Sequence, residues 1–184
     1  MALTPTRQIP LGFTAPDFSL PDTVSGKTLS LDELASDKAT VVMFICNHCP
    51  YVKHVNEGLV QLAQDYLLKG VAFIAISSND VANYPEDSPA RMTAMAKTLG
   101  YPFPYLYDET QEVAKAYSAE CTPDFSIFDG DRKCVYRGQL DGSRPGSGTP
   151  VTGEDIRKAL DAMLAGESVS AEQIPSVGCN IKWK

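Results

Sequence analysis

The sequence predicts an α/β fold: a mixed β-sheet flanked by helices on both faces, with an N-terminal β-hairpin extension. Apolar runs at 40–45 and 71–76 alternate with amphipathic stretches, which is the order typical of parallel β-α-β units. A turn at 129–131 joins two later apolar segments and predicts a closing antiparallel hairpin. The 184 residues suffice for one domain with a full core, or for a domain with extensions.

The first segments of the chain are short. Residues 1–12 are rich in proline and are expected to form a loose arm. Segments 18–20 and 27–31 flank a turn at 24–26, which predicts the hairpin, and one helical turn is expected at 32–35.

Two longer helices have clear boundary signals. Apolar residues at helical spacing predict a helix over 50–69. A second helix is expected at 89–99, because Ser88 can cap it, Pro89 suits its first position and Gly100 follows its end. Further helices are expected at 110–117 and 154–164, and further strands at 103–107, 125–128 and 134–138.

Composition is ordinary for a globular protein, with 43% hydrophobic and 21% charged residues. The net charge of −7 offers no basic stripe for a nucleic-acid partner, and no apolar run is long enough to cross a membrane. The first residues lack the pattern of a signal peptide, so a cytoplasmic protein is expected. We divide the chain into the 1–12 arm, a 13–166 domain and a 167–184 tail that packs on it.

One motif has more diagnostic weight than any other. Residues 46–50, Cys-Asn-His-Cys-Pro, lie where the 40–45 strand turns into the 50–69 helix. A helix N-terminus presents unpaired N–H groups and the positive end of a dipole, and both stabilise a thiolate. Five cysteines are too few for a disulfide scaffold, so this pair favours redox chemistry or metal binding.

Pro50 indicates which cysteine is reactive. Proline is favoured at the first helical position and pushes the residue before it out of helical geometry. Cys49 is therefore the expected N-cap and nucleophile, with Lys53 one turn along as a nearby cation, and Cys46 lies on the strand side. His48 is expected to tune the cysteines or to face the substrate.

The order of elements and the position of the Cys-x-x-Cys motif resemble the thioredoxin superfamily. Residues 15–20, Ala-Pro-Asp-Phe-Ser-Leu, resemble the opening of its AhpC/TSA-type redoxins. The Cys-Asn-His-Cys-Pro motif, together with Gly-Cys-Asn-Ile-Lys-Trp at 178–183, is similar to a peroxiredoxin-like family. The resemblance implies a thioredoxin-like sandwich over nearly the whole chain.

The resemblance also implies site residues. The reactive cysteine of thioredoxins follows a strand phenylalanine by five residues, and counting from Phe44 gives Cys49. The usual resolving position falls on valine, which leaves Cys46, Cys121 and Cys179 as candidates, with Cys46 first. Thr122-Pro123 matches the place of a cis-proline that faces the reactive cysteine, and Cys121 would then lie near the same site.

The main hypothesis is a thiol–disulfide oxidoreductase without a cofactor. Its substrate would be a protein or small-molecule disulfide, and a cellular thiol would serve as reductant. A thiol peroxidase acting on peroxide is the first alternative. Against it, Cys46 occupies the place of the peroxiredoxin threonine, and the 122–125 strand lacks the matching arginine.

A metal-binding or metallochaperone module is the second alternative. Cys46, Cys49 and His54 have the spacing with which a zinc knuckle begins. Leu59 stands where that pattern needs its fourth ligand, so a closed site would require Cys121 or Cys179. We therefore assign no metal ligands from the sequence.

Overall fold

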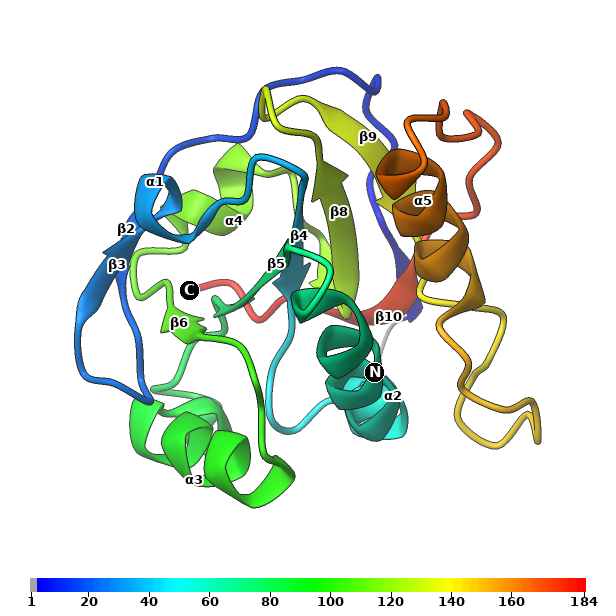
Figure 1. Ribbon diagram of the computed structural model, residues 1–184. Coiled ribbons are helices and arrows are strands. Elements are labelled where there is room, and N and C mark those ends of the chain that lie inside the picture. The colour runs from blue at the N-terminus through cyan, green and yellow to red at the C-terminus, as the bar shows by residue number, and fades with distance from the viewer. Residues whose placement is uncertain (1–2) are drawn as a thin grey trace.

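The computed structural model describes residues 3–184 and contains the expected mixed sheet, in the strand order β6-β5-β4-β8-β9 (Figure 1). β4 (Ala39–Phe44) pairs in parallel with β5 (Val71–Ser77), which pairs in parallel with β6 (Tyr105–Tyr107). β8 (Asp124–Phe128) runs antiparallel to β4 and forms a hairpin with β9 (Cys134–Gly138). The predicted mixed sheet with its closing hairpin is confirmed.

Helices cover both faces of this sheet. α2 (Pro50–Leu67), α3 (Pro89–Leu99) and α5 (Glu154–Leu164) contribute to one apolar cluster. α1 (Leu31–Leu34) and α4 (Glu112–Ala116) contribute to the other. Alternate residues of β4 enter the two clusters, because successive side chains of a strand point to opposite faces. The predicted thioredoxin-like sandwich is therefore confirmed.

The connection from β4 to α2 positions the cysteine motif. All six residues of β4 are buried, so the strand holds the turn from inside the core. Pro50 is the first residue of α2, and Cys49 is the N-cap with extended backbone, φ −65° and ψ 125°. Because proline lacks the N–H that would be unpaired at this position, it starts the helix without loss of a hydrogen bond.

Three smaller features complete the N-terminal and middle parts. β2 (Ser19–Pro21) and β3 (Thr28–Ser30) form the predicted hairpin. A short 3₁₀ helix, η1 (Pro85–Asp87), precedes α3 and was not predicted. α4 begins later than predicted, because Gln111 adopts a positive φ of 65° that a helix cannot continue through.

A second sheet joins the two ends of the chain. β10 (Val177–Asn180) lies between β1 (Leu3–Pro5) and β7 (Cys121–Thr122) and runs antiparallel to both. The expectation of a loose N-terminal arm is therefore wrong for residues 3–5, which are paired with β10. Three residues are too few to show a strand pattern in sequence. Residues 1 and 2 of the predicted arm lie outside the described residues.

The residues after β10 are hydrogen-bonded to the loop that follows β5 and to Gln111 at the start of α4. The Lys182 N–H donates to Asn79 Oδ1 over 2.8 Å. The Lys182 carbonyl accepts hydrogen bonds of 2.8 Å from the Asp80 N–H and from Gln111 Nε2. β10 is thus held by backbone pairing on both edges and by these contacts beyond its end. None of the helices within residues 3–184 has the length and apolar character needed to cross a membrane.

Candidate redox site

Three cysteine sulfurs meet at the N-terminus of α2. Cys49 Sγ lies 2.6 Å from Cys179 Sγ of β10 and 3.3 Å from the Thr122 carbonyl oxygen of β7. Cys46 Sγ lies 3.4 Å from the Thr122 hydroxyl oxygen and is also hydrogen-bonded to Cys49. Segments far apart in the sequence therefore supply one cluster of thiols around Thr122.

Cys49 is the thiolate of this cluster. The largest influence on its pKa is the hydrogen bond from Cys46, and donors from Cys179, Thr122 and the Val52 backbone add to it. Together they outweigh burial and lower the pKa of Cys49 to about 4. Burial and the hydrogen bond to Cys49 raise the pKa of Cys179 to about 12, and the hydrogen bond to Cys49 raises the pKa of Cys46 well above its usual range. Both neighbours thus keep their protons and donate them.

Removing the Cys46 donor is expected to raise the pKa of Cys49. Cys46→Ala loses the largest stabilising contact, so the titration midpoint of the thiolate moves upward from about 4. Cys46→Ser keeps an O–H donor and is the matched control, with a midpoint that stays lower than in the alanine variant. The ultraviolet absorbance of the thiolate across pH measures both. Identical midpoints in the two variants would contradict the role of Cys46 as donor.

The β7 segment supports this cluster from the other side. The Thr122–Pro123 peptide bond is cis, as the resemblance implied. Thr122 pairs with Cys179 in the antiparallel register of β7 and β10. A Cβ on Gly178 would lie 2.0 Å from the Thr122 carbonyl oxygen, so only glycine allows β10 to approach this closely.

None of the three sulfurs lies at the surface. Cys49 has 0% of its surface exposed, Cys46 has 1% and Cys179 has 2%. β10 is part of the cover, because Cys179 is in direct contact with the Cys49 sulfur. A bulky substrate therefore reaches Cys49 only if part of this cover shifts.

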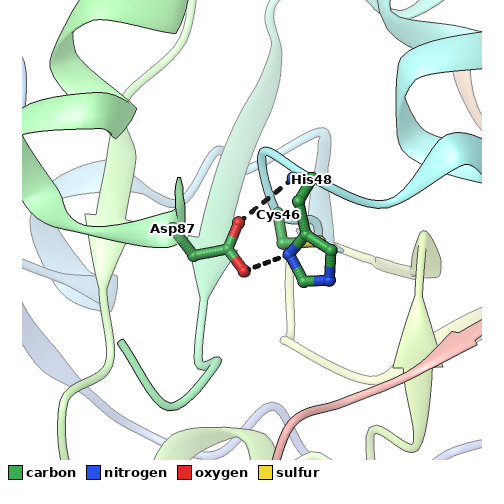
Figure 2. A group of neighbouring side chains, drawn as sticks. All are labelled: Cys46, His48 and Asp87. Atoms are coloured by element: carbon green, nitrogen blue, oxygen red, sulfur yellow. Dashed lines mark hydrogen bonds and ion pairs between the residues drawn. The ribbon is translucent and has the colours of Figure 1, made fainter. Parts of the chain in front are cut away.

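His48 is held by a buried carboxylate, as Figure 2 shows. His48 Nδ1 lies 2.6 Å from Oδ2 of Asp87, a residue with 0% exposure at the end of η1. The same Oδ2 accepts from Asn79 Nδ2 at 2.8 Å. Oδ1 accepts from the Asn47 N–H at 2.7 Å and the His48 N–H at 3.2 Å. The His48 ring also stacks on Tyr84, with centroids 5.3 Å apart and planes 11° apart.

Of the zinc ligands considered from the sequence, Cys46, Cys49 and Cys179 meet, but His54 does not join them. His54 lines a small cavity beside Pro123 and also the groove that His48 lines, and its Nε2 is buried without a hydrogen-bond partner among the described residues. Donor atoms of Cys46, His48 and Asp87 do lie within 4.8 Å of one another. However, the Asp87 oxygens already accept four hydrogen bonds, so this group is a hydrogen-bonded network rather than an open metal cage.

The remaining predicted residues lie farther from the thiolate. Lys53 is exposed and lines an open groove of about 1100 Å³ beside α2 and α3. It is not among the largest influences on the pKa of Cys49, so its predicted role stays a prediction. Cys121 Sγ contacts Thr6 Oγ1 at 3.7 Å instead of the cysteine pair. Cys134 is buried in the cluster on the opposite face of the sheet.

Asp87 and Asn79 carry no signal in the sequence that marks them as site residues. Asp87 stands in a Pro-Glu-Asp-Ser-Pro run, which signals only a loop and the start of a helix. Asn79 lies two residues beyond the end of β5, without any motif around it. No local pattern links either residue to the cysteine motif, because their contacts with it depend on the tertiary fold.

The fold and the site define a thioredoxin-like protein whose cysteine motif lies between a central strand and the helix that follows it. The AhpC/TSA family model matches residues 11–137, and the chain belongs to the AhpC/TSA family. Family membership supports a redox function for this site. No match to the chain was found among the curated proteins.

Solved structures extend the similarity over the whole chain. An uncharacterized conserved protein from Geobacillus kaustophilus is 62% identical, with a TM-score of 0.98 over 100% of this chain and 97% of that chain. A hypothetical protein from Sinorhizobium meliloti is 49% identical, with a TM-score of 0.96 over 98% of each chain. The thioredoxin domain of a thiol-disulfide oxidoreductase from Bacteroides vulgatus is 16% identical, with a TM-score of 0.63 over 82% of this chain and 98% of that domain. The last similarity supports the fold alone.

Proposed function

We propose that the protein is a thiol–disulfide oxidoreductase in which Cys49 is the nucleophile and Cys179 resolves the mixed disulfide. One observation carries the proposal: the Cys49 sulfur, with its pKa lowered to about 4, lies 2.6 Å from the Cys179 sulfur. The Cys49 thiolate attacks one sulfur of a substrate disulfide and forms a mixed disulfide. Cys179 then attacks the Cys49 sulfur, which releases the substrate as a thiol and leaves a Cys49–Cys179 disulfide.

Geometry is the reason to prefer Cys179 over Cys46, the first choice from sequence. A disulfide joins sulfurs about 2.05 Å apart, and Cys179 needs only a small movement from 2.6 Å to reach that distance. Cys46 has a different task, since its hydrogen bond is the largest influence that lowers the pKa of Cys49. A thiol in that position stabilises the nucleophile before the attack.

The substrate and the reductant follow from this chemistry. The substrate is a small or protein disulfide, and a cellular thiol reduces the Cys49–Cys179 bond to close the cycle. A reducing cytoplasm, the compartment expected from the sequence, contains such thiols. Thr122 and Pro123 support the site through the backbone that faces Cys49 and β10.

Peptide mapping of the oxidised protein tests the proposal. After treatment with a small disulfide, the wild-type protein is expected to yield a linked Cys49–Cys179 peptide. Cys179→Ser should accumulate the mixed disulfide on Cys49, whereas Cys134→Ser, a buried cysteine on the other face, should behave like the wild type. A linked Cys46–Cys49 peptide in the wild-type protein would return the resolving role to Cys46.

The burial of Cys49 favours one second candidate, a thiol peroxidase. Hydrogen peroxide is small enough to reach a covered thiolate that a large disulfide cannot approach, and Cys49 is 0% exposed. Attack on peroxide forms a sulfenic acid on Cys49, and Cys179 condenses with it to a disulfide and water. A peroxidase should react faster than free cysteine in stopped-flow oxidation, and a rate no faster than free cysteine would remove this candidate.

A further inference from the structure

Asp87 determines which ring nitrogen of His48 carries a hydrogen. An ionised carboxylate only accepts hydrogen bonds, so the ring nitrogen 2.6 Å from Oδ2 donates as Nδ1–H. The other three hydrogen bonds to this carboxylate also come from N–H donors, so all four contacts are consistent with a carboxylate that only accepts. Nε2 of His48 is left without a hydrogen-bond partner among the described residues.

The ring is fixed in place yet not fully enclosed. Asp87 holds one edge, and the stacked Tyr84 ring covers one face. The His48 side chain keeps 16% of its surface exposed and lines the groove beside α2 and α3, together with Lys53. His48 directly precedes Cys49 in the chain and lines this groove, so we take the groove as the side from which a disulfide approaches the nucleophile.

Disulfide exchange at this site needs a proton donor. The departing sulfur leaves as a thiolate, and an ordinary thiol has a pKa of about 8.5, so the leaving group takes up a proton at neutral pH. The nearby thiols are poor acids, because the pKa values of Cys46 and Cys179 are raised and both protons are directed at Cys49. His48 is a titratable side chain next to Cys49 in the chain, and its Nε2 makes no hydrogen bond within the described residues, so this nitrogen is available to a substrate.

We propose that His48 is a catalytic acid and that Asp87 positions it, an inference that rests on the proposed function. The Cys49 thiolate forms a bond to one substrate sulfur while the substrate S–S bond breaks. The departing sulfur gains the electron pair and takes a proton from Nε2 of protonated His48. Cys179 then attacks Cys49, and the Cys179 proton goes to the second departing sulfur. Two thiols leave, and Cys49 and Cys179 together are oxidised by two electrons.

A comparison of two leaving groups tests the role of His48. Single-turnover rates of the reduced protein are measured with an aromatic disulfide, whose thiolate is stable without a proton, and with an alkyl disulfide, whose thiolate is basic. In His48→Gln the ratio of the alkyl rate to the aromatic rate is expected to fall by about 10²-fold. His54→Gln, which changes the second histidine that lines the same groove, is the matched control and should keep the wild-type ratio.

Asp87→Asn gives a second, independent measurement. An asparagine replaces one acceptor oxygen by an N–H group, so Nδ1 loses its carboxylate partner and the same ratio should fall. Asp87 is fully buried, so the Asp87→Asn variant can fail to fold for reasons of packing alone. In that case the test rests on the rate ratio of His48→Gln, because the His48 side chain is partly exposed. Equal slowing of both disulfides in His48→Gln, or an unchanged ratio, overturns the acid role while the proposed function stands. Failure of the wild-type protein with both disulfides overturns the proposed function and the acid role with it.

Discussion

Cys49→Ser is expected to lower the rate of disulfide exchange at pH 7 by at least about tenfold. Cys49 is almost entirely thiolate at this pH, because its pKa is about 4. In the variant Cys179 loses the contributions of Cys49 to its raised pKa, but burial, the largest cause of that rise, remains and keeps its proton in place. Only a thiolate attacks a disulfide, and a mixed disulfide on Cys179 would have no Cys49 to resolve it, so the remaining cysteines do not replace Cys49.

Insulin reduction, or single-turnover exchange with a small disulfide, measures this loss. Cys134→Ser is the matched control, because Cys134 is equally buried but lies in the apolar cluster on the opposite face of the sheet. A Cys49→Ser variant that exchanges disulfides as fast as the Cys134→Ser control would show that Cys49 is not the nucleophile.

The parts of the fold that were predicted correctly have local causes. Pro50 and Pro89 each start a helix, since both helices begin at the proline. Gly100 caps α3 in the left-handed conformation, with φ 65°. Ser30 and Glu33 form a capping box at α1, and the apolar run of β4 is buried throughout. Each of these elements depends on residues within a few positions of one another, so the sequence pattern contains the necessary information.

The candidate site was predicted only in part, because its main contacts are distant in sequence. The Cys49–Cys179 contact joins residues 130 positions apart, and the His48–Asp87 contact joins residues 39 positions apart. Cys49 could be predicted as the N-cap, because Pro50 marks the first residue of the helix and is its direct neighbour in the chain. The four residues of β10, Val-Gly-Cys-Asn, have no strand pattern, so nothing local showed that they pair with β7. The contact between Cys179 and Cys49 depends on that pairing.

Gly178→Ala is expected to loosen β10 and expose Cys49. An added Cβ would lie 2.0 Å from the Thr122 carbonyl oxygen and 2.7 Å from its carbonyl carbon, and neither backbone atom can move aside easily. The strand must shift away from β7, which costs about 1–3 kcal/mol of stability, as overpacking in a core does. Urea unfolding measures this loss. Gly142→Ala is the matched control, since its added Cβ meets nothing within 4 Å.

The same variant separates access to Cys49 from its ionisation. A shifted β10 withdraws the Cys179 donor, so the pKa of Cys49 rises from about 4, yet the Cys46 donor, the largest influence, remains. Even a pKa of about 6 would leave about 90% thiolate at pH 7. Alkylation of Cys49 by iodoacetamide at pH 7 should therefore be faster in Gly178→Ala than in Gly142→Ala, while the yield of the Cys49–Cys179 disulfide falls. If alkylation is no faster although the variant is destabilised, β10 is not the cover that limits access to Cys49, and a substrate must reach the thiolate from the side of His48.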